Sequence, residues 1–113
     1  MRDIDFTKLV ELFEIILART SFEIIENYGT NLIVYQNTWL TKFENYTIRV
    51  TLYEEKIIIT LDYPHVTFKS KSIPIFLNLI DNYDSYKMNL ISSYIYFSAL
   101  DLIAISKKIE SKN

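Results

Sequence analysis

The chain has 113 residues, of which 14 are acidic, 12 are basic and half are apolar, and its formal net charge is −2. This length predicts a single domain over residues 1–113, with enough apolar side chains for a core. The absence of cysteine excludes disulfides, cysteine-ligated metals and thiol nucleophiles. The slightly acidic charge disfavours long contacts with duplex nucleic acid, which depend on phosphate neutralisation.

Location and origin are inferred from the same composition. Residues 1–6 lack a basic region followed by an apolar run, so no signal peptide is expected. The longest apolar stretch, from Leu90 to Ile105, is interrupted by serines and Asp101, and we expect no membrane span and a cytoplasmic protein. The many Ile, Lys, Asn, Tyr and Phe residues have AT-rich codons, which indicates the AT-rich genome of a bacterium, an archaeon, a plasmid or a virus.

The first predicted element is a helix over residues 4–18. Its apolar side chains recur with the 3.6-residue period of an amphipathic helix, and charged residues fall between them. Asp3 or Asp5 is expected to cap its start.

The pattern then changes to the two-residue period of strands. Strands are expected over 21–27 and 32–39, joined by a turn at 28–31 in which the only glycine, Gly29, would adopt a positive φ. Two further strands are expected over 46–53 and 57–63, joined at Glu54 and Glu55. Residues 66–69 form either a short fifth strand or the end of the sheet.

The remaining sequence predicts helices. Ser72 would cap a helix with Pro74 in its first turn. A long helix is favoured over 87–109, with a strand at 94–97 followed by a shorter helix as the alternative. Short connections favour an antiparallel meander. The expected fold is therefore α+β: a two-layer sandwich of four to five strands with the N-terminal helix and two C-terminal helices on one face.

Resemblance to known families is superficial. The order of elements is similar to that of double-stranded-RNA-binding domains and of secretion chaperones. The motifs of both families are absent, so the resemblance implies nothing about sites or partners.

Candidate catalytic residues are few. His65, the only histidine, follows Pro64 in an expected turn, and no Gly-x-Ser-x-Gly motif accompanies it. The acidic residues include four close pairs: Asp3 and Asp5, Glu23 and Glu26, Glu54 and Glu55, Asp81 and Asp84. Asp3 and Asp5 suit a helix N-terminus, Glu54 and Glu55 a solvated turn, and Asp81 and Asp84 a helix break or cap, which disfavours acid–base or metal chemistry. We therefore expect no catalytic residues, no metal site and no cofactor.

The candidate binding residues are aromatic and basic. If Ile48, Val50 and Leu52 face the helices, Arg49 and Tyr53 lie on the opposite face of their strand. Tyr35 and Trp39 share one face of the preceding strand, and they join Arg49 and Tyr53 if that face is also the open one. Such side chains suit a protein interface, although they could also stack unpaired bases.

The sequence therefore predicts a small non-enzymatic protein-binding module, an accessory or inhibitor protein of a mobile element or virus. We expect it to bind a protein partner and to form a homodimer through the open sheet face. One alternative is a single-stranded nucleic-acid-binding protein that uses the aromatic face. Another is a small carboxylate-dependent hydrolase.

Overall fold

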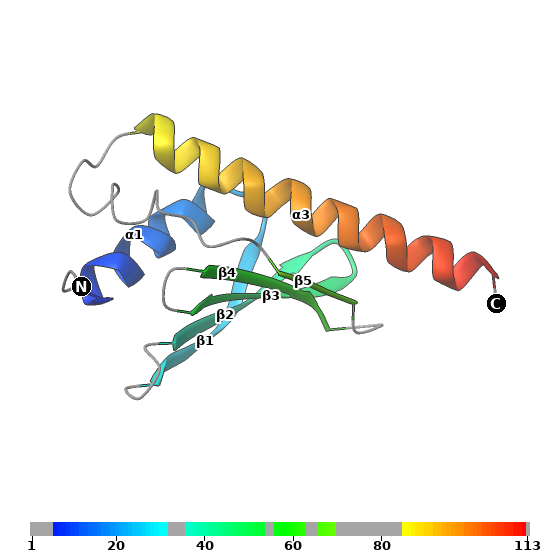
Figure 1. Ribbon diagram of the computed structural model, residues 1–113, viewed down its shortest axis with the longest axis horizontal. Coiled ribbons are helices and arrows are strands. Elements are labelled where there is room, and N and C mark those ends of the chain that lie inside the picture. Colours follow the sequence, from blue (N-terminus) through cyan, green and yellow to red (C-terminus); the bar gives the residue numbers. More distant parts are fainter. Residues whose placement is uncertain (1–5, 32–35, 54–55, 63–65, 70–84, 113) are drawn as a thin grey trace.

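The computed structural model describes residues 6–31, 36–53, 56–62, 66–69 and 85–112, and it shows an α+β domain (Figure 1). The elements in chain order are α1 (Phe6–Ala18), β1 (Glu23–Asn31), β2 (Gln36–Phe43), β3 (Tyr46–Tyr53), β4 (Lys56–Leu61), β5 (Val66–Lys69) and α3 (Ser85–Lys112). The predicted class, α+β with an antiparallel sheet, is confirmed.

The sheet is a meander in the order β1-β2-β3-β4-β5, and every neighbouring pair is antiparallel. Short connections dictate this arrangement, because a two-residue turn can join only antiparallel strands. The turn between β2 and β3 is formed by Glu44 and Asn45, with Phe43 opposite Tyr46. Residue pairs that lie opposite each other share a face, so the register decides which side chains are covered.

One face of the sheet carries the core. Ile48, Val50 and Leu52 alternate along β3 and are fully buried, as the two-residue period predicted. Helices α1 and α3 both lie on this side of the sheet (Figure 1). Their apolar side chains form one cluster with those of the strands, to which α1 contributes Phe13, Ile16 and Leu17, and α3 contributes Met88, Ile91, Ile95, Ala99 and Leu102. Burying each large apolar side chain stabilises the fold by about 1.5–3 kcal/mol before entropy is counted.

Polar contacts join the two helices. The Ser92 hydroxyl donates a buried hydrogen bond of 2.9 Å to the backbone carbonyl of Ile16. The Arg19 guanidinium donates to the Asn89 side-chain oxygen at 2.7 Å. The crossing of α1 and α3 is therefore set by polar contacts as well as by packing.

The first hairpin differs from the sequence prediction. The turn expected at 28–31 is wrong, because β1 continues through Tyr28 and Gly29 to Asn31. Gly29 does not adopt a positive φ; instead Glu44 does, at 57°. Gly29 lies where the register of β1 and β2 shifts, between Tyr28 and Asn31, and glycine inside a strand commonly marks such an irregularity. The residues between β1 and β2, 32–35, lie outside the described part of the chain.

The helical interpretation of 87–109 is confirmed, and the strand alternative at 94–97 is wrong. The expected cap at Asp3 or Asp5, the connection at Glu54 and Glu55, and His65 lie outside the described residues. So does the helix expected after Ser72.

Helix α3 has one property that the sequence analysis missed. Its segment Met88–Lys108 is long and apolar enough to cross a membrane by length and composition, with 44% of the segment's best window buried in the fold. The expectation that no segment reaches this criterion was wrong, because Ser92, Ser93 and Ser98 interrupt the stretch without adding charge. The core helix of a soluble protein meets the same criterion, and α3 packs on the sheet as a core helix does.

Candidate docking site on the open sheet face

The second face of the sheet, here called the open face, carries the alternate residues of the strands. Neither described helix lies on it (Figure 1). The register brings Gln36, Thr38 and Leu40 of β2 beside Arg49, Thr51 and Tyr53 of β3. The next strand, β4, adds Lys56, Ile58 and Thr60 to the same face.

The centre of the open face is small and polar. Thr38 and Thr51 lie directly opposite each other, and the Thr38 hydroxyl donates a hydrogen bond of 3.2 Å to the Thr51 hydroxyl. Both threonines are buried although no described helix covers them. Neighbouring side chains of the sheet therefore shield both threonines from solvent.

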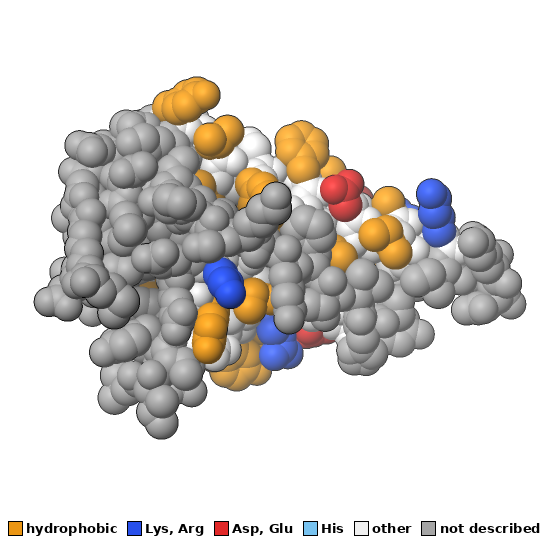
Figure 2. Space-filling view, in the orientation of Figure 1, with side chains coloured by type: hydrophobic (Ala, Val, Ile, Leu, Met, Phe, Trp, Pro, Cys, Tyr) orange, Lys and Arg blue, Asp and Glu red, His pale blue; other side chains and the backbone are white. Residues whose placement is uncertain are grey.

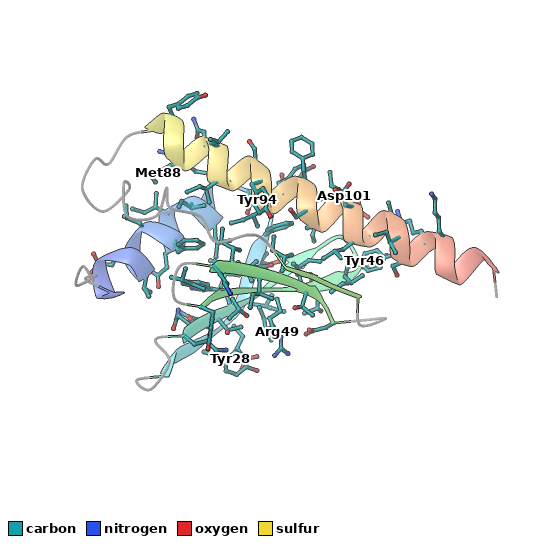
Figure 3. All side chains as sticks on the ribbon, in the orientation of Figure 1. Tyr28, Tyr46, Arg49, Met88, Tyr94 and Asp101 are labelled. Carbon is teal, nitrogen blue, oxygen red and sulfur yellow. The ribbon has the colours of Figure 1, made fainter. Side chains whose placement is uncertain are left out.

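The open face carries a hollow of about 240 Å³, lined by Tyr28, Gly29, Gln36, Thr38 and Arg49. Tyr28 lies opposite Thr38 in the register and is 46% exposed. Gly29 lies next to Tyr28 in β1 and contributes backbone to the lining of the hollow. Figure 3 shows Tyr28 and Arg49 on the side of the sheet away from both helices.

Arg49 is oriented by Asp62. Its Nε lies 3.4 Å from Asp62 Oδ1, and its Nη2 donates to Asp62 Oδ2 at 3.5 Å. The two side chains are 45% and 30% exposed, so this ion pair adds little to stability. It restricts the guanidinium while leaving other N–H donors able to bind a partner.

The structure does not bring the four predicted binding residues together. Arg49 lies on the open face, and Tyr53 is half-buried at the end of β3 on that face. Tyr35 lies outside the described residues. Trp39 is fully buried on the covered face, with its ring stacked on Phe13 at 5.8 Å between centroids and 13° between planes.

The expectation that Trp39 could join the open face was therefore wrong. The turn at Glu44 and Asn45 places Trp39 opposite Val50, and Val50 lies opposite Ile59 on the covered face. The sequence analysis ended the second strand at Trp39 and missed this turn. Recognising it would have placed Trp39 inside the core.

Sequence analysis also missed the residues that complete the hollow. Tyr28 and Gly29 were assigned to a turn, and Gln36 was given no role. Their common cause is the irregular pairing of β1, which shifts register between Ile24 and Glu26 and again between Tyr28 and Asn31. Such bulges redirect side chains. Gly29, as a glycine inside a strand, could have indicated the second shift.

Metal and carboxylate chemistry gains no support from the described residues. Among them, no group of three or more His, Asp or Glu side chains comes together to hold a metal ion. Among the described acidic residues, Glu23 and Glu26 are exposed, whereas Asp62 is half-buried. Asp62 contacts Arg49.

Comparisons with known proteins add no assignment. No protein-family model matches the chain. No curated protein and no solved structure matches it either.

Proposed function

We propose that this chain is a non-catalytic protein-binding module whose docking surface is the open face, centred on the hollow between Tyr28 and Arg49. The observation that carries the proposal is this hollow, with an exposed tyrosine on one side and an oriented arginine on the other. Tyrosine and arginine are the residue types that most often dominate binding energy at protein interfaces.

The surroundings of the hollow suit an interface. The polar Gln36 and Thr38 line it beside Tyr28 and Arg49. An aromatic or basic anchor within a polar surround is typical of non-obligate interfaces, in which the rim keeps hydrogen bonds with water. A partner side chain that enters the hollow would lie beside Tyr28 and accept hydrogen bonds from Arg49.

The edge of the sheet favours docking by side chains. Strand β1 is the last strand on its side, and an outer strand can recruit another chain by backbone pairing. Its two register shifts and the exposed Glu23 and Glu26 oppose such pairing. The partner therefore meets the face of the sheet, where side chains decide specificity.

Site-specific cross-linking in cells tests this function. A photoreactive amino acid at Tyr28 should cross-link one defined protein, and Arg49→Glu should abolish that product while the chain stays folded. The matched control places the same photoreactive residue at Ala18, which is exposed at the end of α1. Equal products from Tyr28 and Ala18, or a product insensitive to Arg49→Glu, would contradict docking at the hollow.

A second candidate function rests on the same two side chains. Tyr28 could stack an unpaired base while Arg49 contacts a phosphate, as in single-strand binding proteins. This candidate is the weaker one, because Arg49 is the one described basic residue that lines the hollow and it is already paired with Asp62. It predicts that the Tyr28 probe cross-links nucleic acid, and that affinity for an oligonucleotide falls as salt rises.

A further inference from the structure

The polar groups that line the hollow supply chiefly hydrogen-bond donors. The side chains are those of Tyr28, Gln36, Thr38 and Arg49, and none of the described lining residues is acidic. The Thr38 hydroxyl already donates to Thr51 at 3.2 Å and accepts from the Gln36 amide at 3.5 Å. The donors that remain are the tyrosine hydroxyl, the second amide hydrogen of Gln36 and the guanidinium. Such a set favours a ligand with negatively charged oxygen atoms.

Arg49 keeps one edge of its guanidinium for such a ligand. Asp62 contacts Nε at 3.4 Å and Nη2 at 3.5 Å, which together form one edge of the planar group. Nη1 and the second hydrogen of Nη2 form the other edge, which can bind a carboxylate through two parallel hydrogen bonds. Both distances to Asp62 exceed the roughly 2.7–2.9 Å of a strong charge-assisted hydrogen bond. The ion pair therefore orients Arg49 without saturating its charge.

Arg49 lies between Asp62 and the rest of the hollow. The other lining residues belong to β1 and β2, on one side of β3, whereas Asp62 directly follows β4, on the other side. Figure 2 shows basic side chains among hydrophobic ones over the sheet, with acidic surface beside them, and Figure 3 labels Arg49 in the same orientation. The guanidinium would therefore separate Asp62 from a carboxylate in the hollow and attract both.

The size and exposure of the hollow fit a side chain of a docked protein. Its volume of about 240 Å³ is below the roughly 300–1,000 Å³ of sites that enclose drug-sized molecules. Tyr28 is 46% exposed and Arg49 45%, and an ion pair this exposed contributes little binding free energy by itself. A free anion would therefore bind weakly, whereas an acidic side chain can be held there by the rest of a docked surface.

From these observations we propose that the hollow binds an acidic side chain, aspartate or glutamate, of the docked protein. Its carboxylate accepts hydrogen bonds from the free edge of Arg49 and lies near Tyr28. This inference rests on the proposed function, because it names the chemistry that the docking surface recognises.

Charged residues around the hollow give the acidic ligand a direction. Lys56 is exposed on the open face opposite Tyr53, and Tyr53 lies opposite Gln36 at the hollow. Glu26 is exposed on the same face, opposite Leu40. Further acidic residues of the partner are therefore attracted toward Lys56 and repelled by Glu26.

NMR titration with a peptide tests this chemistry without the natural partner. Hexaglutamate should shift the amide signals of Tyr28, Gly29 and Arg49 at millimolar concentration, whereas the uncharged hexaglutamine should not. Arg49→Gln should weaken hexaglutamate binding about three- to tenfold, because it removes the charge that the carboxylate contacts. The matched control, Lys107→Gln, removes the same charge from an exposed position of α3 and should leave the affinity unchanged.

Circular dichroism confirms that each variant is folded. Absence of hexaglutamate shifts at the hollow, or equal binding of the two peptides, would overturn the proposal. So would a loss of affinity in Lys107→Gln as large as that in Arg49→Gln.

A second pair of variants should change the affinity in the opposite direction. Glu26→Gln removes a negative charge beside the hollow and should tighten hexaglutamate binding about twofold. Glu11→Gln removes the same charge from an exposed position of α1 and should have no effect. Equal tightening by both variants would show that net charge alone drives binding, which would overturn the assignment to the hollow. An unchanged affinity in Glu26→Gln would contradict the proposed direction of the ligand.

Failure of this inference can be distinguished from failure of the proposed function. Mass spectrometry of the product cross-linked from Tyr28 identifies the partner residue that reacted. We expect an aspartate or glutamate at or next to it, and replacing that acid by lysine should restore binding to Arg49→Glu. A reacted site without acidic neighbours would overturn the acidic ligand while docking at the hollow holds, whereas the absence of any protein product would overturn the proposed function itself.

Discussion

At the scale of single residues, Trp39 shows how one turn decides between a core residue and a surface residue. Its ring lies on Phe13 under α1 and is fully buried. The indole Nε1 is also buried and has no hydrogen-bond partner among the described residues. Trp39 therefore contributes apolar packing, and its polar atom opposes the stability that this packing supplies.

Two substitutions of Trp39 should differ sharply. Trp39→Ala leaves a large cavity and should lower the free energy of unfolding by about 3–5 kcal/mol. Trp39→Phe keeps an aromatic ring against Phe13 and removes the unpaired N–H, so its cost should be well below that of alanine. Urea unfolding followed by circular dichroism measures both. A Trp39→Ala protein as stable as wild type would contradict the burial of this residue.

Residue patterns predicted some positions and failed at others for a physical reason. The alternation of β3 placed Ile48, Val50 and Leu52 in the core because one strand buries every second residue. The sequence did not indicate the turn at Glu44, because glutamate uncommonly adopts a positive φ such as the 57° found here. The pattern instead favoured Gly29, which the structure keeps inside a strand. The preference of Gly29 for a turn was overridden by the pairing of β1 with β2.

At the scale of elements, the contact between α1 and α3 depends on a small polar residue. Ser92 is buried and donates to the carbonyl of Ile16. The same carbonyl accepts the backbone N–H of Arg19 at 3.1 Å. The serine thus joins the end of α1 to the first half of α3, where a larger side chain would separate the helices.

Substitutions at Ser92 should separate its two roles. Ser92→Ala loses one hydrogen bond but keeps the small volume, so it should cost about 0.5–1.5 kcal/mol of unfolding free energy. Ser92→Leu overpacks the crossing and should cost about 1–3 kcal/mol. The control is Ser93→Ala on the exposed side of α3, which should be nearly neutral. Thermal unfolding provides the comparison, and equal stability of the alanine and leucine variants would argue against a close crossing.

The length and the 3.6-residue period predicted both described helices, but not the second surface of α3. The side of α3 that faces the sheet is apolar, and its exposed side also carries large apolar residues. The sequence of this helix is therefore apolar on more than one side. Composition alone cannot distinguish a core face from an interaction face. The sheet beneath α3 is what separates Ile95 from Phe97.

At the scale of the whole molecule, the structure presents two different surfaces on opposite sides of one core. Exposed apolar side chains of α3, among them Tyr86, Leu90 and Phe97, lie on the helical layer, and the hollow lies on the open face of the sheet (Figures 1 and 3).

Docking at the open face depends on which face of the sheet the helices cover, and one NMR measurement tests this directly. Trp39 is the only tryptophan, so its indole N–H signal is unambiguous; Arg49→Lys identifies the Nε–H signal of Arg49. A soluble paramagnetic probe should broaden the Arg49 signal at low concentration and leave the Trp39 indole signal sharp. Comparable broadening of both signals, or stronger broadening of Trp39, would place Trp39 in solvent and contradict the account.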